Sequence, residues 1–297
     1  MSDDDDYDEP TPAEHPHAVD FHDERAELQA PTRSLRRARL IRVAIAAALA
    51  ATVFVVVLLS SGSGENPPPK PGSKRAISTE QTIGSLLAGI PESNNVLGKA
   101  TAPITLRWFG DMECPFCKEY ALGALPSIIE KWVRRGQLKI EYRSLETATR
   151  EPKMFKSQEI AALAAGAQHK MWYFLETFYH EQGEEGSGYV TEKYLRGIAR
   201  QISGLGLGLW VSDRHDPRFP AQLAEDVRLA TIARLRSTPS FLISRAGYPV
   251  KRFVPGSLTN PAPFNKAIEY LLGARAPAIP RAVPAAASAE QMSKARV

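Results

Sequence analysis

The sequence predicts an α/β domain that carries an all-helical insertion and follows a single transmembrane helix. Three observations lead to this prediction: an uncharged apolar run near the N-terminus, a strand-helix-strand pattern that starts at Ile104, and a long helical stretch at about 151–235. The chain has 297 residues, of which 43% are hydrophobic, and this is ample for the core of one such domain.

The N-terminal part is predicted to be a cytoplasmic tail and a membrane anchor. Residues 1–39 are acidic and lack apolar periodicity, which is typical of a disordered tail. The run from Val43 to Leu59 is uncharged and apolar except for Thr52, and a helix over 40–61 approaches the ~30 Å hydrocarbon core of a bilayer. Several closely spaced arginines precede this run, whereas the basic residues that follow it are fewer and more widely spaced. The positive-inside rule therefore places the N-terminus in the cytoplasm. A cleaved signal peptide is the alternative, but no clear A-x-A cleavage site closes the run.

Two low-complexity segments border the predicted domain, which is expected over residues 78–273. Residues 62–77 are rich in Pro, Gly and Ser and predict an extended stalk. Residues 274–297 are dominated by Ala and Pro and predict a disordered tail. We therefore expect a single-pass protein of the cell membrane whose folded domain lies outside the cytoplasm.

Hydrophobic periodicity gives the order of elements within the domain. This order is strand, helix, strand, helical insertion, two strands and a last helix, which is typical of an α/β fold. Pro126 is expected to kink the first helix. The predicted segments are Ile104–Phe109, Pro115–Val133, Leu138–Tyr142, about 151–235, Ser240–Ile243, Tyr248–Val254 and about Pro263–Leu272.

The only two cysteines, Cys114 and Cys117, form a C-x-x-C motif. Residues three apart on a helical turn have β-carbons about 5 to 6 Å apart, so a disulfide needs little backbone movement. Cys114 stands where a strand ends and a helix begins, and the free N–H groups of a helix start stabilise a thiolate. Pro115 occupies a position where a missing N–H costs nothing. Cys114 is therefore the predicted nucleophile, and Cys117 is predicted to resolve the mixed disulfide.

Other roles for this motif, and other classes of ligand, are less favoured. A C-x-x-C motif can be half of a zinc site, but the sequence offers no second pair, so no metal is predicted. A static structural disulfide would close a very short loop and stabilise the fold little. The redox-active disulfide requires no further cofactor. The net charge of +4 is not concentrated in dense Lys/Arg clusters, so nucleic-acid binding is not expected.

A second short motif, Thr238-Pro239, stands at the start of the third predicted strand. Proline is tolerated at the first residue of a strand where no ladder N–H is needed, and a cis peptide is one way to accommodate it. Alone this motif is a weak signal. It gains weight from the C-x-x-C motif and from the predicted strand order.

Over roughly residues 78–273, the sequence resembles the DsbA-like branch of the thioredoxin superfamily. The resemblance implies a thioredoxin-like fold in which a cis Pro239 faces the cysteine pair. It also implies that Thr238, Pro239, Pro115 and Phe116 hold an extended substrate segment beside Cys114, in partial strand addition. Besides the helical insertion before Thr238-Pro239, the matching segments are Leu97-Gly98, Ala102-Pro103-Ile104-Thr105-Leu106, Phe109-Gly110-Asp111 and Cys114-Pro115-Phe116-Cys117.

The resemblance further implies a thiol-disulfide oxidoreductase that forms disulfides in reduced secreted or membrane proteins and is recharged by a quinone-linked membrane oxidase. A disulfide reductase or isomerase of the same fold, and a tethered polypeptide-binding module without catalysis, stay open as alternatives. The chain departs from the family at Phe116, where well-studied oxidases have His, and at Trp108, where many thioredoxin-like proteins have a buried carboxylate. Asp111 and Glu113 are the candidate proton acceptors for Cys117.

Overall fold

The computed structural model describes residues 70–274. The predicted N-terminal tail, the transmembrane helix at 40–61, most of the stalk and the C-terminal tail from residue 275 onward lie outside these residues. Among the residues described, no helix combines the length and the apolar character needed to cross a membrane.

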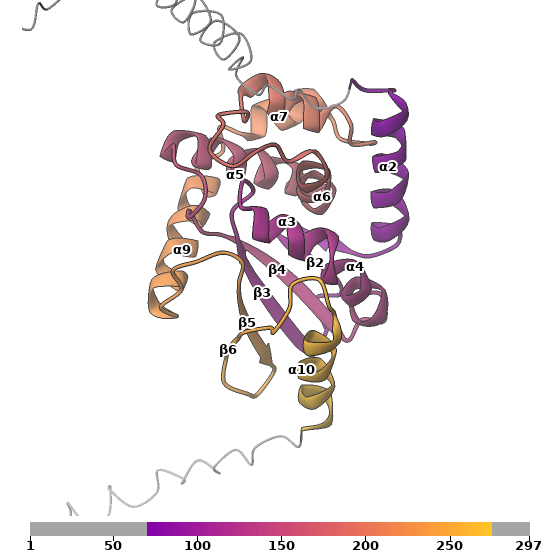
Figure 1. Cartoon of the computed structure of the whole chain (residues 1–297), viewed down its shortest axis with the longest axis vertical. Coiled ribbons are helices and arrows are strands. Elements are labelled where there is room, and N and C mark those ends of the chain that lie inside the picture. Colours follow the sequence, from indigo (N-terminus) through magenta and orange to yellow (C-terminus); the bar gives the residue numbers. More distant parts are fainter. Residues whose placement is uncertain (1–69, 275–297) are drawn as a thin grey trace, which may run out of the picture. The chain divides into compact units, whose positions relative to one another are not determined.

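A six-stranded mixed sheet forms the centre of the domain, in the order β1-β2-β4-β3-β5-β6 (Figure 1). The neighbours β3 and β4 are parallel, whereas every other neighbouring pair is antiparallel. The predicted strands and the predicted hairpin are confirmed in β3 to β6. The first two strands have only two residues each, too few for an alternating pattern to predict them. The strands are β1 Glu92–Ser93, β2 Val96–Leu97, β3 Ile104–Gly110, β4 Leu138–Ser144, β5 Ser240–Arg245 and β6 Lys251–Phe253.

The two central strands direct their most buried side chains to one face of the sheet. In β4 buried and half-buried positions alternate throughout, as the twofold period of a strand requires. Trp108 of β3 and Tyr142 of β4 are register partners and pack edge to face. Phe109 belongs to a separate cluster with Leu242 and the helix α9 (Arg218–Ile232). The main core therefore lies on the face that carries Trp108, and α9 covers the opposite face.

The helix that follows β3 differs from the prediction of one helix kinked at Pro126. It is divided into α3 (Pro115–Leu122), α4 (Ala124–Ile128) and a π-helical turn (Ile129–Val133), and the break falls at Gly123. A β-carbon on Gly123 would lie 2.8 Å from the Cα of Thr259, so only glycine allows this close approach. Pro126 stands in the first turn of α4, where backbone N–H groups have no helical partner in any case. The kink prediction was therefore wrong in its position and its cause.

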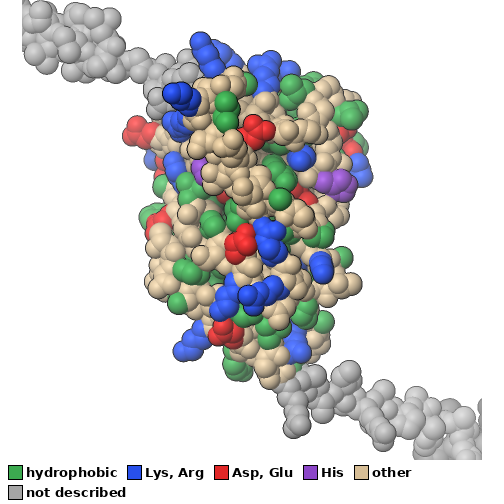
Figure 2. All heavy atoms as spheres, turned by 90° about the vertical axis from the view of Figure 1, so that its right-hand side faces the viewer, with side chains coloured by type: hydrophobic (Ala, Val, Ile, Leu, Met, Phe, Trp, Pro, Cys, Tyr) green, Lys and Arg blue, Asp and Glu red, His purple; other side chains and the backbone are tan. Residues whose placement is uncertain are grey.

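The helical stretch between the second and third predicted strands is confirmed, and its helix α6 packs on α3 and on α2. Helix α2 was not predicted, and it begins at Lys74, inside the segment 62–77 for which an extended stalk was predicted. Ser73 caps it, because its side chain accepts a hydrogen bond from the Ala76 N–H. Figure 2 shows the face of the molecule that carries α2, where basic, acidic and hydrophobic side chains are intermixed. The remaining helices are α2 Lys74–Leu87, α5 Pro152–Gly166, α6 Met171–Glu181, α7 Glu192–Ala199, α8 Leu207–Asp213 and α10 Ala262–Gly273.

Candidate active site

Cys114 lies at the junction of strand β3 and helix α3, as the sequence predicts. It is the N-cap residue of α3, with extended backbone dihedral angles (φ −71°, ψ 121°), and Pro115 is the first residue of the helix. The preceding turn is closed by a hydrogen bond of 3.0 Å from the Cys114 N–H to the carbonyl of Asp111. The sulfur therefore stands at the positive end of α3.

The second motif lies directly against the first. The Thr238-Pro239 peptide bond is cis, as the resemblance implies. The Cys114 thiol donates a hydrogen bond to the carbonyl of Thr238, with 3.4 Å between sulfur and oxygen. The hydroxyls of Thr238 and Thr147 share a further hydrogen bond. The fold thus brings together two motifs that are 124 positions apart in the sequence.

The two cysteines, which are free thiols in this structure, differ in their access to solvent. Cys114 keeps 4% of its surface exposed, whereas Cys117 keeps none. Pro115 is exposed, and Phe116 is 59% exposed. A partner that approaches this surface therefore meets Cys114 and the two residues after it, while Cys117 is sealed within the protein.

The surroundings of the two sulfurs shift their pKa values in opposite directions. A hydrogen bond from Cys117 is the largest of the effects that lower the pKa of Cys114, which stands at about 6. Burial opposes this shift, and Thr238 and the backbone N–H groups of Cys117 and Phe116 assist it. The pKa of Cys117 is raised well above its usual value, first by burial and then by Cys114. This arrangement suits a reactive thiolate at Cys114 and a protonated thiol at Cys117.

The alkylation rate of Cys114 in the reduced protein is expected to rise with pH and to be half-maximal near pH 6, because the thiolate is the reacting form. Cys117→Ala removes the hydrogen-bond donor and should move this midpoint upward, whereas Cys117→Ser keeps a donor and should move it less. The shift is measured as the pH dependence of the rate of alkylation by iodoacetamide between pH 4 and 9. Below the midpoint, this rate changes about tenfold for each pH unit. Equal midpoints for the Ala and Ser variants would contradict a role for Cys117 in lowering the pKa.

The two predicted proton acceptors have different surroundings. Asp111 is fully buried, and its carboxylate accepts hydrogen bonds from the N–H groups of Glu113, Thr147, Ala148 and Thr149 and from the Thr149 hydroxyl, at 2.6 to 3.0 Å. Glu113 is buried as well, and burial, followed by the charge of Asp111, raises its pKa to about 7. Within residues 70–274, no hydrogen bond joins either carboxyl group to the Cys117 thiol. Asp111 thus holds the turn before Cys114, and the acceptor role stays a prediction.

Gln182 is a site residue that the sequence does not reveal. It follows α6, and its side-chain amide donates hydrogen bonds to the carbonyls of Met112 (2.6 Å) and Cys114 (3.1 Å). Lys118 of α3 donates in turn to the backbone carbonyl of Gln182 at 3.3 Å. The Gln182 side chain therefore links the helical insertion to the reactive turn. No local sequence pattern marks such a contact, because the partners are about 70 positions apart.

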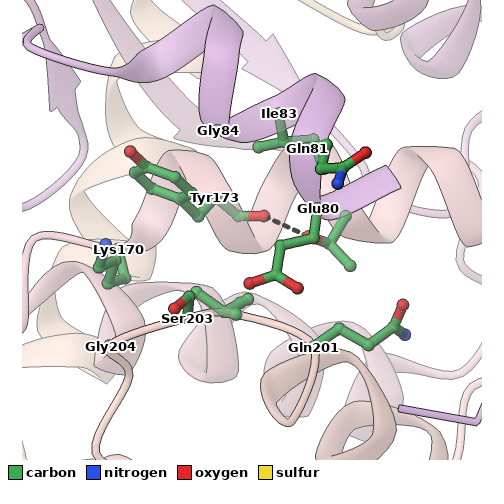
Figure 3. Close-up of a pocket in the computed structure, with 11 residues that line it drawn as sticks. Glu80, Gln81, Ile83, Gly84, Lys170, Tyr173, Gln201, Ser203 and Gly204 are labelled. Carbon is green, nitrogen blue, oxygen red and sulfur yellow. Dashed lines mark hydrogen bonds between the residues drawn. The ribbon is translucent and has the colours of Figure 1, made fainter. Parts of the chain in front are cut away.

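The described domain has one cavity that borders the reactive turn and another that none of the predicted site residues lines. One, of about 290 Å³, is lined by Glu113, Thr149 and residues of the 186–191 loop, and so borders the reactive turn. The other, of about 550 Å³, lies between α2, α6 and the loop after α7, where Glu80, Tyr173 and Ser203 line it (Figure 3). None of the predicted site residues lines this second cavity. Within residues 70–274, no group of three or more His, Cys, Asp and Glu side chains is arranged to hold a metal ion.

The comparisons with known proteins agree with this geometry. A family model described as thioredoxin matches residues 92–251, more than half of the chain. "Probable disulfide bond formation protein D" of Bacillus anthracis is 23% identical over 171 residues, which cover 56% of this chain and 71% of that protein. Disulfide bond formation protein D of Bacillus subtilis is 26% identical over 156 residues, which cover 50% and 67%. The crystal structure of oxidised BdbD from Bacillus subtilis has the same fold, with a TM-score of 0.52 at 20% identity over 61% of this chain and 94% of that one.

Proposed function

Because this chain belongs to the thioredoxin family, as a DsbA-like thiol-disulfide oxidoreductase, we propose that it forms disulfides in exported proteins by exchange at Cys114 and Cys117. The observation that carries the proposal is the pairing of a Cys114 thiol of pKa about 6 with a sealed Cys117 thiol of raised pKa. One sulfur is ionised and faces the surface motif at Thr238. The other, Cys117, lies about one helical turn further along α3 and is fully buried.

The proposed reaction consists of two exchanges. A substrate thiolate attacks the Cys114 sulfur of the oxidised enzyme, the bond between Cys114 and Cys117 breaks, and Cys117 leaves with the electron pair and takes up a proton. A second substrate thiolate then attacks the substrate sulfur of the mixed disulfide and releases Cys114 as a thiolate. The substrate is oxidised by two electrons and the cysteine pair is reduced by two. The low pKa of Cys114 makes it a good leaving group in the second exchange.

The direction proposed is oxidation of the substrate. A thiolate that is stabilised only in the reduced enzyme lowers the free energy of that form, so the disulfide becomes a stronger oxidant. A reductase or isomerase of the same fold differs from an oxidase by small amounts of energy, since about 30 mV corresponds to 1.4 kcal/mol. The reduction potential of the Cys114-Cys117 couple, measured against glutathione, separates these alternatives.

The surface proposed to receive the substrate comprises Pro115, Phe116, Thr238 and Pro239. Phe116 offers an exposed apolar ring, and the carbonyl of Thr238 lies beside the Cys114 sulfur. An extended substrate segment would add to the backbone at Thr238. The proposed substrates are reduced secreted or membrane proteins.

The proposed location is the outer side of the cell membrane, with residues 40–61 as the anchor and the N-terminus in the cytoplasm. The uncharged run from Val43 to Leu59 and the arginines before it support this topology. Such an anchor would keep the domain near a quinone-linked membrane reoxidant, the proposed electron acceptor. Protease accessibility of the domain in intact cells, compared with permeabilised cells, tests the topology.

Replacing Cys117 by Ala is expected to trap substrates on the enzyme as mixed disulfides. The Cys114 thiolate attacks a disulfide of an exported protein, one substrate sulfur leaves as a thiolate and takes up a proton, and no Cys117 thiol remains to break the new bond. Non-reducing gels of extracts from cells that express the Cys117→Ala variant should show adducts that disappear when the sample is reduced with dithiothreitol. Cys114→Ser combined with Cys117→Ala is the control and should show none. If the single variant forms no adducts with exported proteins, the proposed exchange is contradicted.

A further inference from the structure

The cavity beside the reactive turn has no role in the exchange described above. It encloses about 290 Å³, and three segments line it: the turn that carries Glu113, residues within 149–154, and residues within 186–191 of the loop between α6 and α7. Glu113 directly precedes Cys114 in the chain. A group that enters this cavity therefore lies next to the surface proposed to receive the substrate.

The carboxyl group of Glu113 lines the cavity and has no hydrogen-bond donor of its own. Only 5% of the residue is exposed, and within residues 70–274 its side chain takes part in no hydrogen bond of normal geometry, although its backbone N–H does. The hydroxyl of Thr149 also acts on this carboxyl group, but it donates its single hydrogen to Asp111 at 2.6 Å. Buried polar groups in folded proteins nearly always have a partner. A buried carboxyl group that lines a cavity without a donor therefore indicates that a donor binds there.

The charges around Glu113 favour a positively charged donor. Burial raises the pKa of Glu113 to about 7, and the negative charges of Asp111 and Glu185 add to this effect. A cation in the cavity would be attracted by all three carboxyl groups. It would also offset the cost of a buried negative charge on Glu113.

The other walls of the cavity suit the apolar stem of a long side chain. Met154 of α5, which is half-buried, and Val190, which is buried, both line it. Arg150 is the only basic residue among the described residues of the lining, and its side chain is exposed. It lies near Gly186, where a β-carbon would be 3.8 Å from the Arg150 Nε. Lysine and arginine side chains lay their methylene groups along apolar surface and keep the charged group at the end.

The cavity is at a suitable distance from the cysteine of a bound substrate. In an extended segment, alternate side chains point to the same side, so the residues two positions from the cysteine also face the enzyme. Their Cα atoms lie about 6.6 Å from that of the cysteine. On the enzyme, the Cα atoms of Glu113 and Cys114 are neighbours at about 3.8 Å. A long side chain of the substrate can thus enter the cavity while the cysteine meets Cys114.

We propose that this cavity is a specificity site, which receives a lysine or arginine side chain two positions from the exchanging cysteine and binds its cationic group at Glu113. This inference rests on the exchange proposed above and names a substrate class for it, exported proteins with a basic residue close to a cysteine. The methylene groups of the substrate side chain lie against Met154 and Val190. Its cationic group donates hydrogen bonds to the Glu113 carboxylate.

The test measures how fast the oxidised full-length protein oxidises three reduced peptides. Each peptide has two cysteines, and the residues two positions before and after each cysteine are lysine, norleucine or glutamate. Norleucine keeps the stem of lysine without its charge, and glutamate tests the opposite preference, for a negative group beside Arg150. A charge near a cysteine also changes the reactivity of the thiol. Each second-order rate constant is therefore divided by that of the same peptide with hydroxyethyl disulfide, which is uncharged.

Two variants alter the cavity, and a third is the matched control. Glu113→Gln removes the carboxylate and keeps the size of the side chain. Met154→Lys places an ammonium group on the wall, where it competes with the substrate for Glu113. Glu146→Gln removes a carboxylate that is exposed outside the cavity, in the loop after β4, and that also interacts with Asp111. A general effect of a variant on the exchange acts on all three peptides and cancels in the ratio between them.

The wild type is expected to oxidise the lysine peptide at least about fivefold faster than the norleucine peptide, because hydrogen bonds to a charged group are strong in a partly buried site. The glutamate peptide should be the slowest. Glu113→Gln and Met154→Lys should each reduce the ratio between lysine and norleucine to no more than about twofold, as screened surface charges give. Glu146→Gln should keep the wild-type ratio.

The outcomes separate this inference from the function on which it rests. Equal normalised rates for the three peptides, or a preference for glutamate, would overturn the specificity site and leave the proposed function in place. A lysine preference that persists in both cavity variants, or that falls equally in Glu146→Gln, would overturn the site as well. If one cavity variant does not fold, the other decides. A wild type that oxidises none of the peptides would contradict the proposed exchange itself, and this inference would fall with it.

Discussion

Cys114→Ser is expected to reduce the rate of disulfide formation in a reduced test peptide by at least about a thousandfold, because a serine hydroxyl neither ionises at neutral pH nor forms a disulfide. The variant removes the thiol whose pKa stands at about 6 and leaves a hydroxyl in its place beside the Thr238 carbonyl. The fold should be unaffected, because serine is smaller than cysteine and is a favoured N-cap residue. The measurement is the rate at which free thiols of the peptide disappear in the presence of the oxidised enzyme.

Cys117→Ser is the matched control, because it also leaves a single cysteine in the chain. It should keep the fast alkylation of Cys114 while it loses turnover, so the two variants separate the reactive sulfur from the resolving one. Turnover by Cys114→Ser at more than a few per cent of the wild-type rate would contradict the assignment. The same variant tests the binding-module alternative, since a module without catalysis would keep its partners and its cellular role after this change.

Asp111→Asn is expected to lower the free energy of unfolding by about 3 to 5 kcal/mol, the range for breaking a buried charged network. The carboxylate accepts five hydrogen bonds, four of them from backbone N–H groups. An asparagine turns an NH₂ group toward some of these donors and leaves them unpaired in the interior. Urea unfolding of the reduced protein, followed by far-UV circular dichroism, measures the change.

Glu113→Gln provides the comparison for this loss of stability. Glu113 is two positions further along the same turn and is also buried, but burial penalises its charge, so a neutral amide resembles its protonated form. Glu113→Gln is therefore expected to change the free energy of unfolding by less than about 1 kcal/mol. Equal stability of Asp111→Asn and the wild type would show that the hydrogen bonds of Asp111 do not hold the turn.

Features that arise from local sequence were predictable, whereas those that arise from long-range contacts were not. The C-x-x-C spacing, the strand before it and the helix after it are local, and the structure contains all three. The break at Gly123 was missed because it results from the approach of Thr259, a residue of the last connection. The extended stalk was predicted to end at residue 77, but α2 begins at Lys74. The error arose because Ser73 was not recognised as the N-cap residue of a helix.

The candidate site shows the same division. The contact between Cys114 and Thr238 was expected only from a resemblance to a known family, since no periodicity joins two segments so far apart. The hydrogen bonds from Gln182 to the reactive turn were not expected. Glutamine after a helix is common in sequences, and only the packing of the insertion on the rest of the domain gives this one a role.

Because Gln182 binds the reactive turn, the helical insertion is part of the structure that positions Cys114. A shortened chain in which residues 152–232 were replaced by a brief linker would keep the six strands and both cysteines, yet the carbonyls of Met112 and Cys114 would lose the amide that binds them. Efforts to miniaturise this enzyme, or to graft its cysteine motif onto a smaller scaffold, would therefore have to supply a new donor for these two carbonyls.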